Sequence, residues 1–241
     1  YVVGKVWSVV GHHNWIHRLI VLLIFFTSLF RLHKALSRYL DTFWSLTASV
    51  FLFTSPLLVY YANNFLSNVP ALSFSVIGLA IYLEYRKDKK PRQWIYLSLA
   101  FAMAGLLKIT GFVGFLAICA SELYFLLFTK DSRIPWKTFL AGTSVAVSTV
   151  FLWYYYAEQY NELHGGKYTF NDIWPIWRMS AYEIDRALTF FTKITLFQIL
   201  ALPSYLILLS GLVFILSKIR KIPKDLGIIL LISLFGFALY F

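Results

Sequence analysis

The sequence predicts an all-α, polytopic membrane protein, with about seven or eight transmembrane helices in a single domain over residues 1–241. The composition is the first indication: 59% of the residues are hydrophobic, 20% are aromatic and only 14% are charged. This balance is too apolar for a soluble domain of the same length. The second indication is a series of apolar stretches near the roughly 20 residues that cross a bilayer as a helix. The third is the distribution of positive charge between them.

Lysine and arginine cluster in every second connection between the apolar stretches, at residues 31–38, 86–92, 130–137 and 218–224. The intervening connections carry few charges or balanced ones. This alternation is the positive-inside pattern, which places the basic connections in the cytoplasm. Because the cations lie at the ends of apolar stretches, anionic lipid headgroups account for the net charge of +11, and we expect no nucleic-acid partner.

Apolar stretches bounded by Gly, Pro and charge clusters predict the spans in order: residues 15–32, 42–61, 71–85, 93–107, 111–128, 138–156, 194–216 and 226–241. Residues 63–70 are too polar for lipid, so we expect an outer connection there. Residues 157–193 form the only long polar stretch and predict an extracytoplasmic element. Since the chain begins at Tyr1 and ends in an apolar run, we expect a piece of a longer protein.

Two basic residues fall outside the cytoplasmic clusters and are the main site candidates. Arg18 lies just inside the outer end of the first span, and Lys108 lies at the outer turn between two spans. Ionisable groups at membrane depth are costly and usually functional. The pair either binds a phosphate or pyrophosphate in an outward-facing cavity, or snorkels to the interface and anchors its helices. The nearby polar segment favours a cavity, with candidate lining residues Tyr61, Asn63, Asn64 and Asn68.

Histidine and acidic residues supply weaker candidates. His12 and His13, with His17 at helical spacing from His13, suggest a shared metal ion, but no acidic or cysteine ligand lies near them, and we predict no metal site. Glu162 and His164, in the long outer segment, are candidates for acid/base chemistry. The chain contains no P-loop and no dinucleotide fingerprint, so neither ATP nor NAD is expected.

Three segments together are similar to a known family. They are the sequence from Trp15-Ile-His-Arg-Leu to the basic end at Arg38, the stretch from Ser55-Pro-Leu-Leu to Ser67-Asn-Val-Pro70, and Ala104-Gly-Leu-Leu-Lys-Ile-Thr-Gly111. In this order they resemble the C-type (GT-C) polytopic membrane glycosyltransferases, most closely the protein O-mannosyltransferase and aminoarabinose-transferase branches. The resemblance covers residues 11–128.

The resemblance implies transfer of a sugar from a polyprenyl-phosphate donor to a lipid, glycan or protein acceptor on the extracytoplasmic face. Arg18 and Lys108 match the family's donor-phosphate contacts, which would stabilise the anionic leaving group. The family's acidic catalytic residue would lie in a loop upstream of Tyr1, so the catalytic residue is unknown here and the fragment alone is expected to be inactive. No cofactor is implied. Asn68 stands where relatives often carry an aspartate, which disfavours a divalent cation without excluding it.

Two alternatives remain open at this point. A transporter or flippase of a lipid-linked or anionic solute would also place cations in a membrane cavity, although no inverted repeat is visible in the sequence. A scaffold subunit would leave Arg18 and Lys108 as anchors. Under every interpretation the protein is a multi-pass membrane protein. The glycosyltransferase interpretation predicts the bacterial inner membrane or the endoplasmic reticulum, with the active site on the extracytoplasmic side.

Overall fold

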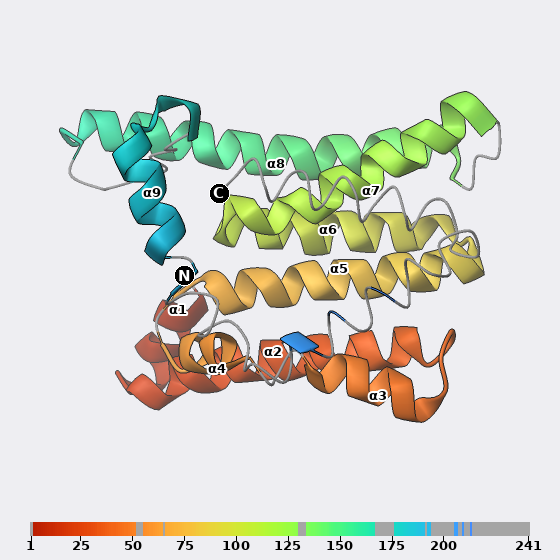
Figure 1. Cartoon of the computed structure of the whole chain (residues 1–241), viewed down its shortest axis with the longest axis horizontal. Coiled ribbons are helices and arrows are strands. Elements are labelled where there is room, and N and C mark those ends of the chain that lie inside the picture. Colours follow the sequence, from red (N-terminus) through yellow and green to blue (C-terminus); the bar gives the residue numbers. More distant parts are fainter. Residues whose placement is uncertain are drawn as a thin grey trace.

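The computed structural model describes residues 2–51, 55–64, 66–129, 134–166, 176–190, 192–193, 205–206, 209 and 213. The described part of the chain is helical and contains no strand, as predicted. Its elements are α1 Val2–Val10, α2 Asn14–Leu36, α3 Thr42–Phe51, α4 Pro56–Ala62, α5 Asn68–Asp88, α6 Pro91–Leu107, the 3₁₀ helix η2 Ile109–Phe112, α7 Val113–Tyr124, the π-helix η3 Phe125–Thr129, α8 Trp136–Leu163, the 3₁₀ helix η4 Ile176–Arg178 and α9 Ala181–Phe190. The long helices lie side by side, and α9 crosses one end of the bundle (Figure 1).

Four segments among the described residues are long and apolar enough to cross a membrane: Asn14–Leu36, Asn68–Asp88, Ile109–Phe128 and Trp136–Leu163. The protein is therefore an integral membrane protein built as an all-α polytopic bundle. Four is fewer than the predicted seven or eight. One reason is that α6, at 17 residues, is slightly short for a span. The predicted spans 194–216 and 226–241 lie outside the described residues, apart from a few positions in the first of them.

The predicted span over residues 42–61 is not one continuous helix. α3 ends at Phe51, and α4 starts afresh at Pro56, with the Ser55 side chain accepting a hydrogen bond from the Leu58 N–H at 3.4 Å. Proline lacks an N–H and has a fixed φ, so it suits the first turn of a helix and not its interior. The polar connection predicted after this span is also shorter than expected, because α5 already begins at Asn68.

Other helices run past their predicted ends. α2 continues to Leu36, α5 to Asp88 and α8 to Leu163. Apolar runs mark the part of a helix in contact with lipid, but the backbone hydrogen bonds of the helix continue beyond that part. Cations in the last turn of a helix stabilise it through a favourable interaction with the helix dipole. Glu162 therefore belongs to the last turn of α8 and not to a loop.

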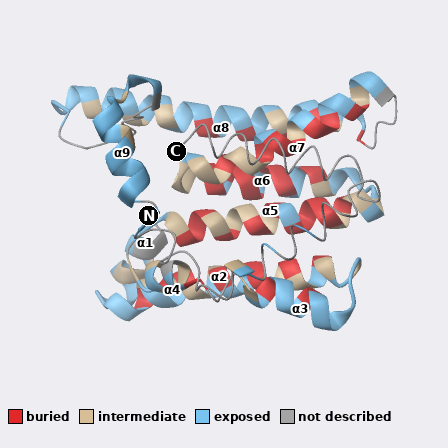
Figure 2. Ribbon diagram, viewed as in Figure 1, coloured by how far each residue is buried: buried red, intermediate tan, exposed pale blue. Residues whose placement is uncertain are grey.

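The core lies between α5, α6, α7 and α8, where the buried residues concentrate (Figure 2). Glycines let these helices approach closely, as in many membrane bundles. A Cβ added at Gly78 would lie 2.5 Å from the Phe101 ring, and one at Gly142 would lie 2.7 Å from Trp94. In the same core, the buried Glu122 of α7 accepts a hydrogen bond of 2.8 Å from the Tyr82 hydroxyl of α5.

Candidate functional site

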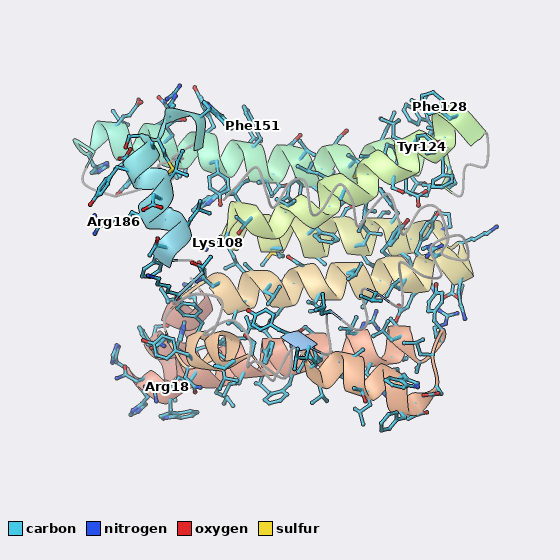
Figure 3. The ribbon with its side chains drawn as sticks, viewed as in Figure 1. Arg18, Lys108, Tyr124, Phe128, Phe151 and Arg186 are labelled. Carbon is cyan, nitrogen blue, oxygen red and sulfur yellow. The ribbon has the colours of Figure 1, made fainter. Side chains whose placement is uncertain are left out.

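Arg18 and Lys108 lie at the same end of the bundle, the end crossed by α9, whereas Tyr124 and Phe128 mark the other end (Figure 3). We call this the Lys108 end and define it by residues 14–18, 61–64, 66–70 and 105–112. The helices α2, α5 and η2 start here, and α4 and α6 end here. Chain segments far apart in sequence therefore supply the predicted site residues from one side of the membrane domain.

Lys108 occupies a break between two helices, as the sequence predicted. α6 ends at Leu107, and Lys108 takes an extended backbone conformation before η2 begins. The break keeps its backbone hydrogen bonds, since the Lys108 N–H donates to the Ala104 carbonyl and the Gly111 N–H donates to the Lys108 carbonyl, both at 2.9 Å. The half-buried Lys108 side chain reaches Asn68, and its Nζ donates to Asn68 Oδ1 at 3.1 Å.

Hydroxyl groups from two other helices bind the backbone on either side of Lys108. The Tyr154 hydroxyl of α8 donates to the Gly105 carbonyl at 3.1 Å. The Ser75 hydroxyl of α5 lies 2.8 Å from the Gly111 carbonyl. Neither residue could be recognised from the sequence, because a single tyrosine or serine within an apolar span carries no distinctive pattern.

Arg18 lies on the face of α2 that is turned toward the bundle. The buried residues Val21 and Phe25 follow it at intervals of three and seven positions, which place them on the same face of a helix. Arg18 itself is exposed, and within the described residues its side chain has no hydrogen bond or ion pair. Its neighbour His17 places Nε2 3.3 Å from the Asn64 carbonyl oxygen. The residue next to Arg18 in α2 therefore contacts the asparagine segment, while Arg18 itself is exposed.

The predicted lining residues have different roles in the structure. The side-chain amides of Asn63 and Asn64 donate to the Val59 and Tyr60 carbonyls at 3.0 and 2.8 Å, so they close the end of α4. Tyr61 is partly buried against the cluster formed by Val21, Phe25, Leu29, Ala62 and Val69. Among these candidates only Asn68 contacts a candidate cation.

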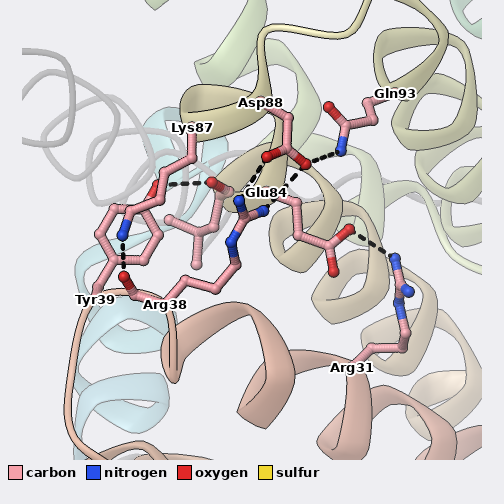
Figure 4. Close-up of polar contacts among 8 residues, drawn as sticks. Arg31, Arg38, Tyr39, Glu84, Lys87, Asp88 and Gln93 are labelled. Carbon is pink, nitrogen blue, oxygen red and sulfur yellow. Dashed lines mark hydrogen bonds and ion pairs between the residues drawn. The ribbon is translucent and has the colours of Figure 1, made fainter.

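The opposite end of the bundle contains the connections from α2 to α3 and from α5 to α6 (Figure 1). We define it by residues 31–41 and 84–93 and call it the Asp88 end, and Figure 4 shows its polar contacts. Here arginines pair with carboxylates. Arg31 Nη2 lies 3.0 Å from Glu84 Oε2. Arg38 binds both carboxylate oxygens of Asp88, which also accepts from Gln93 Nε2 at 3.1 Å. Lys87 Nζ lies 4.3 Å from the centre of the Tyr39 ring and donates to the Arg38 carbonyl.

A family model described as dolichyl-phosphate-mannose-protein mannosyltransferase matches residues 1–156. The chain belongs to this family. The match extends from α1 into α8, and it includes all the residues that define the Lys108 end. No curated protein and no solved structure shows a significant match to the chain.

Membership confirms the resemblance found in the sequence. This mannosyltransferase-family chain is a GT-C-type membrane glycosyltransferase whose sugar donor is linked to dolichyl phosphate. Dolichyl phosphate is a polyprenyl phosphate, the class of donor that the resemblance implied. The matched region is wider than residues 11–128, the part of the chain that carried the resemblance.

The weaker candidates make local contacts in this mannosyltransferase-family chain. His13 precedes α2, so the assumed helical spacing between His13 and His17 is wrong. The His12 ring packs on Trp7, with 4.1 Å between ring centres. No group of three or more His, Cys, Asp or Glu residues that could hold a metal occurs in the described ranges.

Glu162 and His164 make local contacts at the end of α8. Gln159 Nε2 lies 3.5 Å from Glu162 Oε2. The His164 ring stacks on Tyr160 with 4.0 Å between ring centres, and its Nδ1 lies 2.8 Å from the Tyr160 carbonyl oxygen. Both residues are exposed, and these contacts give them a role in closing the helix end.

Proposed function

We propose that the Lys108 end binds the phosphate of a polyprenyl-phosphate sugar donor through Lys108 and Arg18, for transfer of the sugar to a lipid, glycan or protein acceptor. The observation that carries this proposal is the absence of a carboxylate partner for either cation in the described part of the chain. Lys108 contacts a neutral amide, and Arg18 is exposed on the inner face of α2. By contrast, arginines at the Asp88 end have carboxylate partners.

Both cations suit the chemistry of this donor. When the glycosidic bond breaks, the leaving group is an anionic lipid phosphate, and a fixed cation stabilises the charge that develops on it. An ammonium group has three N–H donors, and Asn68 takes one of those of Lys108. Within the described ranges the other two have no partner and are available for phosphate oxygens. The planar guanidinium of Arg18 suits a bidentate contact with phosphate.

The same proposal assigns the site to the extracytoplasmic face. The basic clusters 31–38 and 86–92 fall at the Asp88 end, and cytoplasmic connections carry the excess of lysine and arginine. The Lys108 end then faces the periplasm of a bacterium or the lumen of the endoplasmic reticulum. Asn68 is then a hydrogen-bond acceptor for Lys108 and not a metal ligand, because a neutral amide is a weak substitute for a carboxylate ligand.

The test uses the full-length protein in nanodiscs with a radiolabelled polyprenyl-phosphate sugar. The Kd for polyprenyl phosphate and the rate of sugar transfer are measured for Lys108→Gln and Arg18→Gln. Loss of a charge-assisted hydrogen bond costs about 1.5–3 kcal/mol, so we expect a Kd roughly 10- to 150-fold weaker for each variant. Lys34→Gln is the matched control, because Lys34 is an exposed cation in the last turn of α2.

Unchanged Kd values for both variants, with transfer intact, would contradict the assignment. Movement of labelled donor across the bilayer without any transfer would instead favour the transporter interpretation.

A further inference from the structure

We propose that Tyr154 and Ser75 are positioning residues that hold the Lys108 ammonium in its donor-binding place. This inference rests on the proposed role of Lys108. It concerns the backbone break from Gly105 to Gly111, which is held by hydroxyl groups from α8 on one side of Lys108 and from α5 on the other.

The Tyr154 contact lies on the α6 side of the break. The last carbonyl groups of a helix have no partner within the helix and must be satisfied from elsewhere. Gly105 is one of these positions, since α6 ends at Leu107. The Tyr154 hydroxyl donates to its carbonyl at 3.1 Å. The end of α6 is thereby tied to α8 three residues before Lys108.

The Ser75 contact lies on the η2 side of the break. The Ser75 hydroxyl lies 2.8 Å from the Gly111 carbonyl and 3.0 Å from the Ala71 carbonyl of its own helix. Space around Gly111 is restricted, because a Cβ there would lie 3.2 Å from both the Ala104 carbonyl oxygen and Ser75 Oγ. η2 is thereby tied to α5 three residues after Lys108.

α5 therefore fixes Lys108 twice. Ser75 holds the backbone that follows it, and Asn68, in the first turn of the same helix, binds the ammonium at 3.1 Å. Lysine has a flexible four-carbon stem, which loses conformational freedom when its ammonium binds a ligand. A backbone and an ammonium that are already held in place reduce this cost for the donor phosphate. Freeing either carbonyl lets the break shift, and the ammonium then leaves the productive position.

The test measures the Kd for polyprenyl phosphate on the full-length protein carrying Tyr154→Phe or Ser75→Ala. We expect each variant to bind about three- to tenfold more weakly, because its hydrogen bond is lost while the size of the side chain is nearly kept. Ser75→Thr, which retains the hydroxyl, is expected to restore binding. If Tyr154→Phe does not give folded protein, Ser75→Ala and Ser75→Thr alone decide the test.

Matched controls come from neighbouring positions. Tyr155→Phe removes the hydroxyl of an exposed tyrosine that stacks along Phe151. Ser73→Ala removes a hydroxyl whose one hydrogen bond among the described residues is to the Val69 carbonyl of its own helix, at 2.8 Å. Both controls should leave the Kd unchanged.

A double-mutant cycle with Lys108→Gln separates this inference from the proposed function. If Tyr154 and Ser75 act through Lys108, their substitution has no further effect on the Kd once Lys108 is glutamine. Effects of full size in the Lys108→Gln background, or no effect in the wild-type background, would overturn the positioning role while leaving the role of Lys108 intact. No effect of Lys108→Gln itself would remove Lys108 from the proposed donor site and refute the inference with it.

Discussion

The two ends of the bundle differ in the partners of their arginine and lysine side chains. At the Asp88 end, Arg31 and Arg38 pair with Glu84 and Asp88, and these pairs join α2 and the turn after it to α5. At the Lys108 end, the lysine contacts an amide, and Arg18 has no partner within the described residues.

This difference separates structural cations from candidate ligand-binding cations. A carboxylate that neutralises an arginine within the protein leaves little charge for an external anion, whereas a cation held by a neutral amide keeps its full charge. Sequence position separates Arg18 and Lys108 from the basic clusters, but only the contacts show which cations have a carboxylate partner. The comparison is tested by changing the charge at each end and following both stability and donor affinity.

The largest effect is expected from reversing the charge at the Lys108 end. Lys108→Glu places a carboxylate opposite the donor phosphate, so we expect sugar transfer to fall by roughly 10²- to 10³-fold, comparable to the loss of a group that stabilises the transition state. The Tm should change little, because the described partner of the ammonium is a single half-exposed amide. Transfer assays and thermal unfolding of the full-length protein measure the two quantities. A large loss of stability with normal donor affinity in the remaining folded protein would remove the contrast between the two ends.

At the Asp88 end we expect a loss of stability without a loss of donor affinity. Glu84→Gln leaves the partly buried Arg31 guanidinium without its carboxylate, and we expect a loss of about 1–3 kcal/mol in the free energy of unfolding. The donor Kd should remain at its wild-type value. Denaturant titration checks the stability, and Arg31→Gln in the same background should restore part of it. A weaker donor Kd in Glu84→Gln would show that the two ends are not independent.

Two close helix crossings test the same difference between the ends by overpacking. A Cβ at Gly142 would lie 2.7 Å from Trp94, and one at Gly105 would lie 2.7 Å from Val150. We expect Gly142→Ala and Gly105→Ala each to cost about 1–3 kcal/mol of stability through overpacking. Only Gly105→Ala should also weaken donor binding, because the Gly105 carbonyl is the one that accepts from Tyr154. Gly4→Ala, with nothing within 4 Å of the added Cβ, is the control; equal donor affinities for all three variants would argue against the link between Gly105 and the site.

The smallest effect concerns the N-terminus of α9, which crosses the Lys108 end. The Ser180 backbone N–H and hydroxyl both donate to Glu183 at 2.8 Å, and they hold the pKa of that carboxyl below its ordinary value of 4.5. The stabilisation of α9 by the ionised Glu183 carboxylate is thus complete above pH 4.5 and disappears as the pH falls through the lowered pKa. Hydrogen-exchange protection of α9 should therefore decrease slightly in acid in the wild type and be insensitive to acid in Glu183→Gln. Asp185→Asn, in the same helix, is expected to keep the wild-type pH dependence.

The general architecture could be predicted from the sequence because it depends on local composition. Apolar runs gave the all-α membrane bundle, and Lys108 followed by Gly111 marked the break between α6 and η2. The order of short motifs also indicated the family. Helix ends were less predictable, since α2, α5 and α8 continue beyond their apolar parts into polar residues, where hydropathy no longer follows the backbone.

The contacts that distinguish the two ends could not be predicted. Arg31 and Glu84 are 53 residues apart, and Lys108 and Asn68 are 40 apart, so their pairing depends on which helices are neighbours. The contact between Tyr154 and Gly105 depends in addition on the rotation of α8 about its axis. One apolar sequence is compatible with many such arrangements, and only packing selects among them.

The most direct test of the central claim is a cryo-electron microscopy structure of the full-length protein with polyprenyl phosphate bound. We expect density for the phosphate within hydrogen-bonding distance, about 3 Å, of Lys108 Nζ and the Arg18 guanidinium, with the salt bridges of the Asp88 end unchanged. A phosphate bound away from both residues, or bound at the Asp88 end, would contradict the proposed donor site.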